Sequence, residues 1–424
     1  MRLKGYYGSP RITWEYLDCS MPLTFDQHSN CGYNCAYCFS QYQRGLGETA
    51  DYYHKNYKAV NVERIKKIWS GEIKTGWSPI IKSGIPIQWG GLSDPFCPFE
   101  EDSRIGLELL KFFLDVKQPI SFSSKSDLIL RDERYFDLFK KAGNLWHYKA
   151  SIITLDPEKS KIIEAGAPSP QRRIEVLKKL REAGTLTTWR LRPFILGITD
   201  RDLEEQIKIA AEVGCQSATT EFFCLESRSF GKKHVLENYK KISQVCGFNI
   251  IDFYRKNTPG AGLLRLNYTL KKPYIKRFIN ACKENNIAYF VSDAHHKEKS
   301  CSGSCCGLLD SNEHFKGYAK YQYTYLIQIA KKKGFVTISD AENASNEYEK
   351  EWRKNTVLEG NRNVAGEGRR RRGKMSMQDY FMYLWNRPEK QNSPQGYLEG
   401  ILKAGGKDKD GNVIYFYDYK KSEI

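Results

Sequence analysis

The sequence Cys31-Gly-Tyr-Asn-Cys35-Ala-Tyr-Cys38-Phe39 places three thiols on one short loop, with three and then two residues between them. A [4Fe-4S] cluster is held at four irons, usually by four cysteines, so three thiolates leave one iron open to a small molecule. Structural zinc is the alternative, but it takes four Cys or His ligands, typically as separated pairs, and His28 is the nearest candidate for the fourth. The loop therefore favours an iron-sulfur site with one exchangeable position.

Short apolar or alternating stretches before and after this loop read as strands, and amphipathic stretches between them read as helices. The expected strands are Met21–Phe25, Ile85–Trp89, Pro119–Ser124, Tyr148–Thr154, Thr187–Phe194, Ser217–Phe223 and Ile287–Ser292. The expected helices are Val62–Trp69, Tyr135–Ala142, Pro170–Ala183, Leu203–Val213 and Tyr274–Asn285. This alternation predicts an α/β fold with a parallel sheet, either open or closed as a full or partial (β/α) barrel, with the chemistry at the C-terminal ends of the strands.

The segment Gly90-Gly91-Leu-Ser93-Asp94 follows the second of these strands. Its glycines permit close approach of a ligand to the backbone, and Ser93 and Asp94 offer acceptors for an ammonium group. A tight turn from strand to helix needs the same glycines and is the alternative interpretation.

The cysteine loop, with Tyr37 before its last thiol, resembles the signature of the radical SAM superfamily. Three further segments resemble the spore photoproduct lyase-like branch of that superfamily, so that the resemblance covers roughly residues 20 to 225. These segments are Ser93-Asp94-Pro95-Phe96, Glu164–Pro170 with the arginines that follow it, and Arg190–Ile195.

The resemblance implies a (β/α) barrel of the radical SAM type and an enzyme, a lyase or a modification enzyme. By this resemblance, the enzyme would cleave S-adenosylmethionine at a [4Fe-4S] cluster and use the 5'-deoxyadenosyl radical to abstract hydrogen. The implied cluster ligands are Cys31, Cys35 and Cys38. The implied contacts to the cofactor are Gly90, Gly91, Ser93 and Asp94 at its methionine end, Ser151 at its carboxylate or ribose, and Arg173 and Arg192 near cofactor or substrate. For each arginine, an ion pair with an acid such as Glu164 is the alternative.

One departure from the pattern concerns the hydrogen donor. The lyase has a cysteine two residues ahead of its Ser-Asp pair, where it returns a hydrogen atom to the base, and this chain has Gly91 there. Repair of a thymine dimer by the same route is therefore not expected. The candidate catalytic thiols are Cys97, Cys224 and Cys305, with plain burial as the alternative for each.

A second group of thiols follows Ser292-Asp-Ala-His295-His296, at Cys301, Cys305 and Cys306. Three interpretations remain open: a second iron-sulfur cluster or zinc site, redox-active thiols or hydrogen donors that face the radical, and unrelated buried cysteines.

Composition adds broad limits. The chain has 424 residues, twelve cysteines and a net charge of +17. No apolar run is long enough to span a bilayer and the start lacks a signal-peptide core, so we expect a cytoplasmic protein without a membrane partner, in which cysteines serve metal sites rather than disulfides. The charge favours an anionic partner.

The C-terminal segment combines the basic run Arg369–Lys374 with the aromatic stretch Tyr380–Trp385, a composition suited to a nucleic-acid surface. We therefore expect an N-terminal arm (1–19), a barrel (20–298), a Cys-rich loop with a helix (299–345) and a small appended unit (346–424).

The expected substrate is a nucleic-acid base or nucleotide, and the expected reducing partner is a flavodoxin or ferredoxin. The alternatives are a peptide or small-molecule radical enzyme, and a nucleic-acid-binding protein with a structural or redox-sensing cluster.

Overall fold

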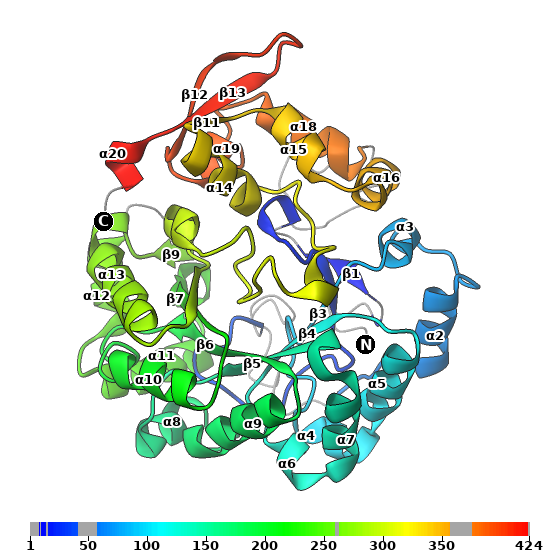
Figure 1. Cartoon of the computed structure of the whole chain (residues 1–424). Coiled ribbons are helices and arrows are strands. Elements are labelled where there is room, and N and C mark those ends of the chain that lie inside the picture. Colours follow the sequence, from blue (N-terminus) through cyan, green and yellow to red (C-terminus); the bar gives the residue numbers. More distant parts are fainter. Residues whose placement is uncertain are drawn as a thin grey trace.

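An eight-stranded sheet organises the chain, whose computed structural model describes residues 8, 10–13, 16–40, 57–258, 263–356 and 375–422. The strand order is β1-β2-β3-β4-β5-β6-β7-β10 (Figure 1). β1 is antiparallel to β2, and every later pair is parallel. The bounds are β1 Arg11–Ile12, β2 Leu23–Phe25, β3 Ile87–Trp89, β4 Ile120–Ser124, β5 Trp146–Ser151, β6 Leu186–Phe194, β7 Ser217–Phe222 and β10 Ala288–Val291. β1 and β10 form the two edges, so the sheet is a partial (β/α) barrel, as the sequence predicted.

Helices connect consecutive parallel strands and lie along the outer side of the sheet (Figure 1). They are α2 Val62–Ser70, α3 Ser78–Lys82, α4 Pro98–Ser103, α5 Ile105–Asp115, α6 Leu128–Arg131, α7 Glu133–Ala142, α8 Pro157–Ile163, α9 Pro170–Glu182, α10 Leu203–Glu212 and α13 Tyr268–Glu284. Asn267 caps α13, and the helix runs through Pro273, so it begins at Tyr268 rather than at the predicted Tyr274.

An excursion that the sequence pattern did not reveal separates β7 from α13. It consists of β8 Cys224–Glu226, α11 Lys233–Cys246, α12 Ile250–Asn257 and β9 Leu263–Arg265. β8 and β9 pair as a separate two-stranded sheet.

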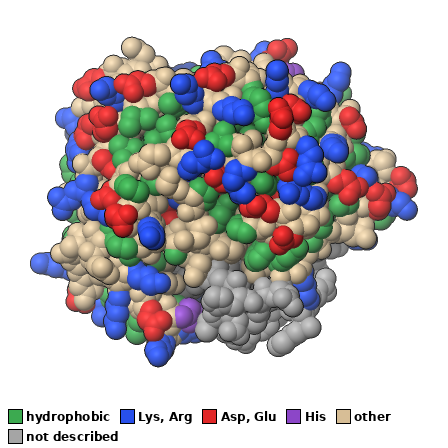
Figure 2. Space-filling view, turned by 90° about the horizontal axis from the view of Figure 1, so that it is seen from below, with side chains coloured by type: hydrophobic (Ala, Val, Ile, Leu, Met, Phe, Trp, Pro, Cys, Tyr) green, Lys and Arg blue, Asp and Glu red, His purple; other side chains and the backbone are tan. Residues whose placement is uncertain are grey.

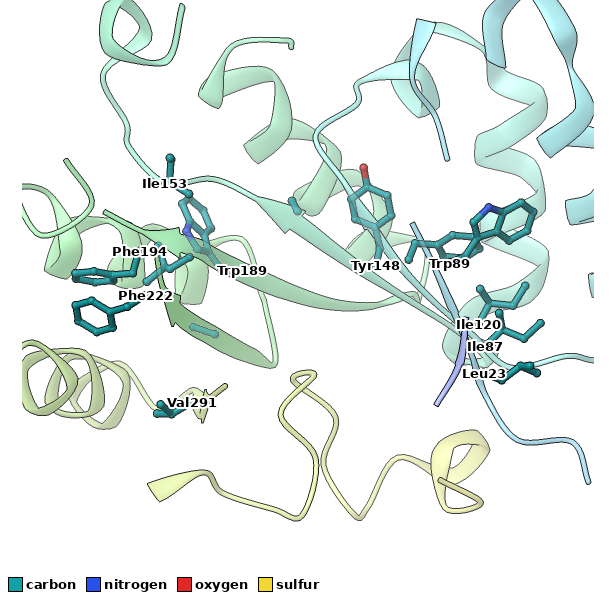
Figure 3. Packing of buried hydrophobic residues seen from close by; sticks show 14 of the residues in the cluster. Leu23, Ile87, Trp89, Ile120, Tyr148, Ile153, Trp189, Phe194, Phe222 and Val291 are labelled. Atoms are coloured by element: carbon teal, nitrogen blue, oxygen red, sulfur yellow. The ribbon is translucent and has the colours of Figure 1, made fainter. Parts of the chain in front are cut away.

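Aromatic side chains fill the space between the sheet and the helices. Trp89, Tyr148 and Trp189 project from one side of the sheet in Figure 3, and the loop after β10, drawn in yellow, runs along the other side. The ring of Trp146 packs on that of Phe139 in α7, with centroids 5.1 Å apart. Because side chains alternate along a strand, β5 turns His147, Lys149 and Ser151 toward the inner side.

The loop after β10 fills part of that inner side. The Ser217 hydroxyl donates to the Gly307 carbonyl at 2.8 Å, and the Thr219 hydroxyl donates to the Cys305 carbonyl at 3.0 Å. Gly307 has φ +84°, and a Cβ at this residue would lie 2.6 Å from the Thr188 side chain. Glycine is therefore required here, both by the backbone conformation and by the close approach to β6.

The C-terminal unit contains a three-stranded sheet in the order β11-β13-β12. Its elements are α14 Tyr323–Lys333, β11 Phe335–Val336, α15 Ile338–Ala344, α16 Glu347–Asn355, α18 Met377–Trp385, α19 Pro394–Tyr397, β12 Leu402–Lys407, β13 Val413–Tyr417 and α20 Tyr419–Ser422. Because β11 pairs with β13, this sheet draws on both sides of the boundary predicted at residue 345.

The aromatic stretch of α18 does not form the base-stacking surface that its composition suggested. Tyr380, Phe381 and Trp385 are buried, and the Trp385 indole donates to the Val413 carbonyl at 2.7 Å. These rings are the core of the C-terminal unit. The basic run Arg369–Lys374 lies outside the described residues.

The N-terminal arm is tied to the C-terminal unit through Asp18, which is buried. Its carboxylate forms an ion pair with Lys297 and accepts a hydrogen bond from the Tyr397 hydroxyl at 2.7 Å.

Lys and Arg side chains alternate with Asp and Glu across the face shown in Figure 2, so the positive charge forms no single patch there. None of the helices in the described residues has the length and apolar character needed to cross a bilayer.

Candidate active site

The three-cysteine loop follows β2 directly. Cys35 is buried, Cys31 and Cys38 are partly exposed, and none of the three forms a disulfide. The Cys38 amide donates to the Cys35 carbonyl at 3.1 Å, which closes a turn that keeps these two residues together.

The segment after α8 supports this loop from behind. Cys35 forms an isolated antiparallel bridge with Glu164, and the Gly166 amide donates to the Tyr33 carbonyl at 3.0 Å. A Cβ at Gly166 would lie 2.8 Å from the Gly32 carbonyl oxygen, so only glycine allows this contact. The Glu164–Pro170 motif therefore acts as the structural backing of the cysteine loop.

A buried ion pair fixes the backing in place. Arg173 donates from Nη1 to Glu164 at 2.6 Å and to the Ser151 carbonyl at 3.0 Å, and the Tyr37 hydroxyl also donates to Glu164. Burial opposes ionisation of Glu164, but the charges of Arg173 and Lys125 and these hydrogen bonds hold its pKa below the usual value. Arg173 is thus a positioning residue for the cysteine loop. Its contacts are those of the ion pair with Glu164, which the sequence analysis gave as the alternative to a cofactor contact.

Cys97 lies on the far side of the loop from this ion pair. A hydrogen bond with Cys97, together with burial, raises the pKa of the Cys31 thiol. The Cys97 sulfur is also 4.0 Å from Nδ1 of His28, whose Nε2 is hydrogen-bonded to the Ser103 hydroxyl at 3.0 Å. Both residues are buried, and Cys97 directly precedes α4.

The donor set fits an iron-sulfur cluster better than a single metal ion. Nowhere in the described ranges do three His, Cys, Asp or Glu side chains surround one ion position. The three thiolates of a [4Fe-4S] cluster bind three different irons, so they stand farther apart than the ligands of one ion. The three thiols of this backed loop supply the ligand types and number that such a cluster needs.

The glycine turn after β3 is organised by Asp26, which the sequence analysis did not single out. Its Oδ1 accepts from the amides of Leu92 and Ser93 at 2.9 and 3.0 Å, and its Oδ2 pairs with Arg11 at 2.6 Å. The only sequence signal was the position of this acid at the C-terminal end of β2. Gly90 has φ +94°, and a Cβ there would lie 2.6 Å from the Ser123 carbonyl oxygen.

Asp94 joins this turn to the end of β4. Its carboxylate accepts hydrogen bonds from the Phe96 amide at 2.9 Å, the Ser124 hydroxyl at 2.8 Å and the Lys125 amide at 2.6 Å. Burial raises its pKa in spite of these bonds. A carboxylate has about four acceptor sites, so one remains for a ligand. The Ser93 hydroxyl donates to the His28 carbonyl at 3.0 Å and keeps its lone pairs.

Two cations, the buried Lys149 and the partly buried Arg190, lie on the inner side of the sheet. Lys149 donates to the Gln88 side chain at 2.7 Å, and Arg190 donates from Nη1 to the Ser151 hydroxyl at 2.9 Å. Burial lowers the pKa of Lys149 to about 8, and burial with the nearby charge of Arg192 lowers the pKa of Arg190 to about 9. Within the described part of the chain, neither cation has a carboxylate partner, whereas Arg192 forms an ion pair with Glu221.

The second thiol group divides into two parts. Cys305 and Cys306 are buried together with Met21 and face Lys149. The exposed Cys301 lies elsewhere, because its sulfur accepts from the Tyr289 amide at 3.4 Å. The structure therefore does not bring together the three thiols expected to form a second cluster or a zinc site.

The third candidate catalytic thiol, Cys224, begins β8 and donates to the Phe222 carbonyl at 3.7 Å. The structure thus places the three candidates in three different surroundings: Cys97 beside Cys31 of the cysteine loop, Cys224 after β7, and Cys305 against β7 and the end of β10.

Three comparisons relate the chain to known proteins. Residues 28–210 match the Radical SAM superfamily. An uncharacterized protein of Methanocaldococcus jannaschii is 26% identical over 280 residues, which cover 62% of this chain and 86% of that protein.

Two solved structures are also similar. A spore photoproduct lyase mutant with bound AdoMet and dinucleoside spore photoproduct has a TM-score of 0.47 and 15% identity, covering 66% of this chain and 78% of the other. SuiB of Streptococcus suis, bound to S-adenosylmethionine, has a TM-score of 0.40 and 14% identity, covering 64% and 51%.

The family match begins just before the cysteine loop, extends through the glycine turn and the Glu164–Arg173 pair, and includes the strands that carry Lys149 and Arg190. It therefore covers the parts of the chain that form the site. Residues 28–210 of the chain, which carry the cysteine loop, the glycine turn and the two cations, therefore match the radical SAM superfamily, whose members are enzymes that use S-adenosylmethionine for radical chemistry.

Proposed function

We propose that this enzyme abstracts hydrogen from a nucleic-acid base or nucleotide, in a repair or modification reaction of the spore photoproduct lyase-like kind. The observation that carries the proposal is the pair of cations, the buried Lys149 and the partly buried Arg190, for which the described residues provide no carboxylate, although the charge of the Cys306 thiol acts on both. Burying an unpaired charge is costly, so such cations are normally matched by an anion. A substrate phosphate on the inner side of the sheet would supply that anion.

When bound, the cluster and S-adenosylmethionine supply the 5'-deoxyadenosyl radical, and the protein orients the reactants and excludes water. Cys31, Cys35 and Cys38 would hold the cluster. The acceptors of Ser93 and Asp94 and the backbone at Gly90 and Gly91 suit the methionine end of the cofactor. Ser151 and Arg192, at the ends of β5 and β6, suit the carboxylate or ribose.

One broader feature, the net charge, agrees with a nucleic-acid substrate. The net charge of +17 favours a polyanion. A base in a duplex would have to be flipped out to reach the inner side of the sheet, so a single strand should be the better substrate. We further propose a flavodoxin or ferredoxin as the reducing partner.

A peptide or small molecule with a carboxylate is the second candidate, because a carboxylate would also match the two cations. The two candidates differ in their response to salt. Each phosphate that a protein neutralises contributes about −0.9 to the slope of log affinity against log salt for duplex DNA, and about −0.7 for single strands. A single carboxylate gives no comparable dependence.

The test uses the reconstituted enzyme with a fluorescent single-stranded DNA oligonucleotide. We expect binding by anisotropy that weakens steeply with salt, and faster formation of 5'-deoxyadenosine when the oligonucleotide is present. Lys149→Met and Arg190→Met should each weaken binding and reduce the salt slope, whereas Lys208→Met, at an exposed pair with Glu212, should not. Formation of 5'-deoxyadenosine that ignores DNA and RNA would support the peptide or small-molecule candidate. DNA binding without cleavage of S-adenosylmethionine would indicate a binding protein with a structural or sensing cluster.

A further inference from the structure

Hydrogen bonds from neighbouring elements hold the backbone of the Cys305–Cys306 pair in place. Hydroxyls of Thr219 and Ser292 donate to the Cys305 carbonyl at 3.0 and 3.2 Å, and the Cys306 amide donates to the Ser304 hydroxyl at 3.2 Å. Strands β7 and the end of β10 therefore fix the backbone of the pair from one side. The position of the two thiols on the inner side of the sheet follows from these contacts.

The pair lies just below the layer of residues assigned to the cofactor. Lys149, which faces Cys306, precedes Ser151 by two residues on the same side of β5. Arg190 likewise precedes Arg192 on β6. Two residues of a strand span about 6.6 Å. A substrate bound against the two cations would thus lie between the cofactor layer and the thiols.

The two thiols differ in charge state. The hydrogen bond from Cys305, followed by the charges of Lys149 and Arg192, lowers the pKa of Cys306 to about 6, against burial and the nearby Cys19. The same hydrogen bond and burial raise the pKa of Cys305. At neutral pH the arrangement is a thiol beside a thiolate, and the thiolate faces a cation.

We propose that Cys305 donates a hydrogen atom to the substrate radical and that Cys306 captures the resulting thiyl radical, so that the pair ends the turnover as a disulfide. This inference rests on the proposed radical chemistry and deepens it by naming the donor. Cys305 is preferred to Cys97 and Cys224 because it, unlike them, is among the groups whose charge acts on Lys149 and Arg190.

The step balances in atoms and electrons. The S–H bond of Cys305 breaks and a C–H bond forms on the substrate. The thiyl radical and the Cys306 thiolate form a disulfide radical anion, which gives one electron to an oxidised carrier protein of the flavodoxin or ferredoxin class. A dithiol reductant then restores both thiols and is itself oxidised to a disulfide.

Because Cys305 and Cys306 are adjacent in sequence, a disulfide between them should be easy to reduce after each turnover. Consecutive Cα atoms are about 3.8 Å apart, closer than the 4.4–6.8 Å that is usual for disulfides, by general geometry. A disulfide here would be strained, and strained disulfides are easily reduced.

The first test needs neither cluster nor substrate. The folded protein is equilibrated in graded glutathione buffers, trapped with N-ethylmaleimide and mapped by peptide mass spectrometry. We expect a reversible Cys305–Cys306 disulfide in the wild type and in Cys301→Ser, and its loss in Cys305→Ser and Cys306→Ser. A pair that stays reduced throughout, or a Cys19–Cys306 disulfide in its place, would overturn the assignment.

The second test is a single turnover of the reconstituted enzyme with S-adenosylmethionine and a single-stranded DNA oligonucleotide of all four bases. Flavodoxin, its reductase and NADPH supply the electron, because dithionite can itself reduce disulfides. We expect about one Cys305–Cys306 disulfide for each 5'-deoxyadenosine, in the wild type and in Cys301→Ser. DNA-stimulated formation of 5'-deoxyadenosine with both thiols still reduced would overturn the donor assignment and leave the proposed function intact. Absence of 5'-deoxyadenosine from a loaded enzyme would overturn both.

Discussion

Two loops of this molecule carry three thiols each, and their surroundings give them different chemistry. The Cys31–Cys38 loop is backed by the buried Glu164–Arg173 ion pair, which holds its backbone, and burial raises the pKa of the Cys35 thiol against the charge of Lys125. The Cys301–Cys306 loop is held by hydroxyls of the sheet, and it presents two adjacent thiols to Lys149. The comparison teaches that cysteine spacing alone does not define a metal site, because the groups behind the thiols decide whether they hold a cluster or act as a redox pair.

The largest effect should come from removing the first set of thiols. Replacing Cys31, Cys35 and Cys38 together with alanine should reduce bound iron and 5'-deoxyadenosine formation to background, because the cluster loses all its protein ligands. Iron analysis and chromatography of the reaction mixture measure both. The double variant Cys305→Ala, Cys306→Ala is the matched control and should keep its iron. Equal iron loss in the two variants would remove the distinction between the loops.

The backing of the first loop gives the next effect. Arg173→Met leaves the Glu164 carboxylate buried without its cation, which should destabilise the protein by about 3–5 kcal/mol. Urea denaturation measures the free energy of unfolding, and iron content reports on the loop. The double variant Arg173→Met, Glu164→Leu should recover part of the stability because no buried charge remains. A single variant as stable as the wild type would show that the pair does not support the loop.

Gly307→Ala probes the second loop in the same way. The left-handed conformation costs an alanine about 1–2 kcal/mol, and the contact with Thr188 adds about 1–3 kcal/mol of overpacking. Gly247 is the matched control, because it has φ +82° but no atom within 4 Å of an added Cβ. Gly247→Ala should therefore show only the smaller cost in urea denaturation. Equal losses of unfolding free energy in the two variants would mean that Gly307 is not in close contact with Thr188 of β6.

These expectations also show what the sequence could predict. The cysteine loop and the parallel strands follow from local spacing and periodicity, which sequence displays directly, whereas periodicity left open whether the sheet stays open or closes as a full or partial barrel. The insertion of residues 301–308 against the sheet depends on contacts between Gly307 and Thr188, more than a hundred positions apart. Local sequence patterns do not predict a contact between residues so far apart in the chain.

Composition was also an ambiguous guide at two sites. The aromatic residues of α18 have the composition of a stacking surface, but burial of Trp385 makes them a core. Arginine is a residue type that often contacts ligands, but the guanidinium of Arg173 forms an ion pair with Glu164. In both cases tertiary packing decides the outcome, and a single sequence does not reveal packing.

The smallest effect concerns the charge of the thiol pair. Lys149→Met removes the cation beside Cys306 and should raise the pKa of that thiol by about 1–3 units, since a nearby opposite charge lowers a pKa by that amount. Its alkylation by iodoacetamide should then lose the midpoint near pH 6 and require more alkaline pH. Lys331→Met is the control, because Lys331 lies near Cys301 and its loss should leave Cys306 unchanged. An unchanged midpoint in Lys149→Met would show that Lys149 does not lower the pKa of the Cys306 thiol.

The division of labour between the two loops is tested most directly by the iron and sulfide content of the anaerobically reconstituted wild-type protein. The account predicts about four irons and four sulfides per chain, the content of one [4Fe-4S] cluster, with Cys305 and Cys306 still open to alkylation. About eight irons per chain, with those two thiols protected, would contradict it and identify the second loop as another cluster site.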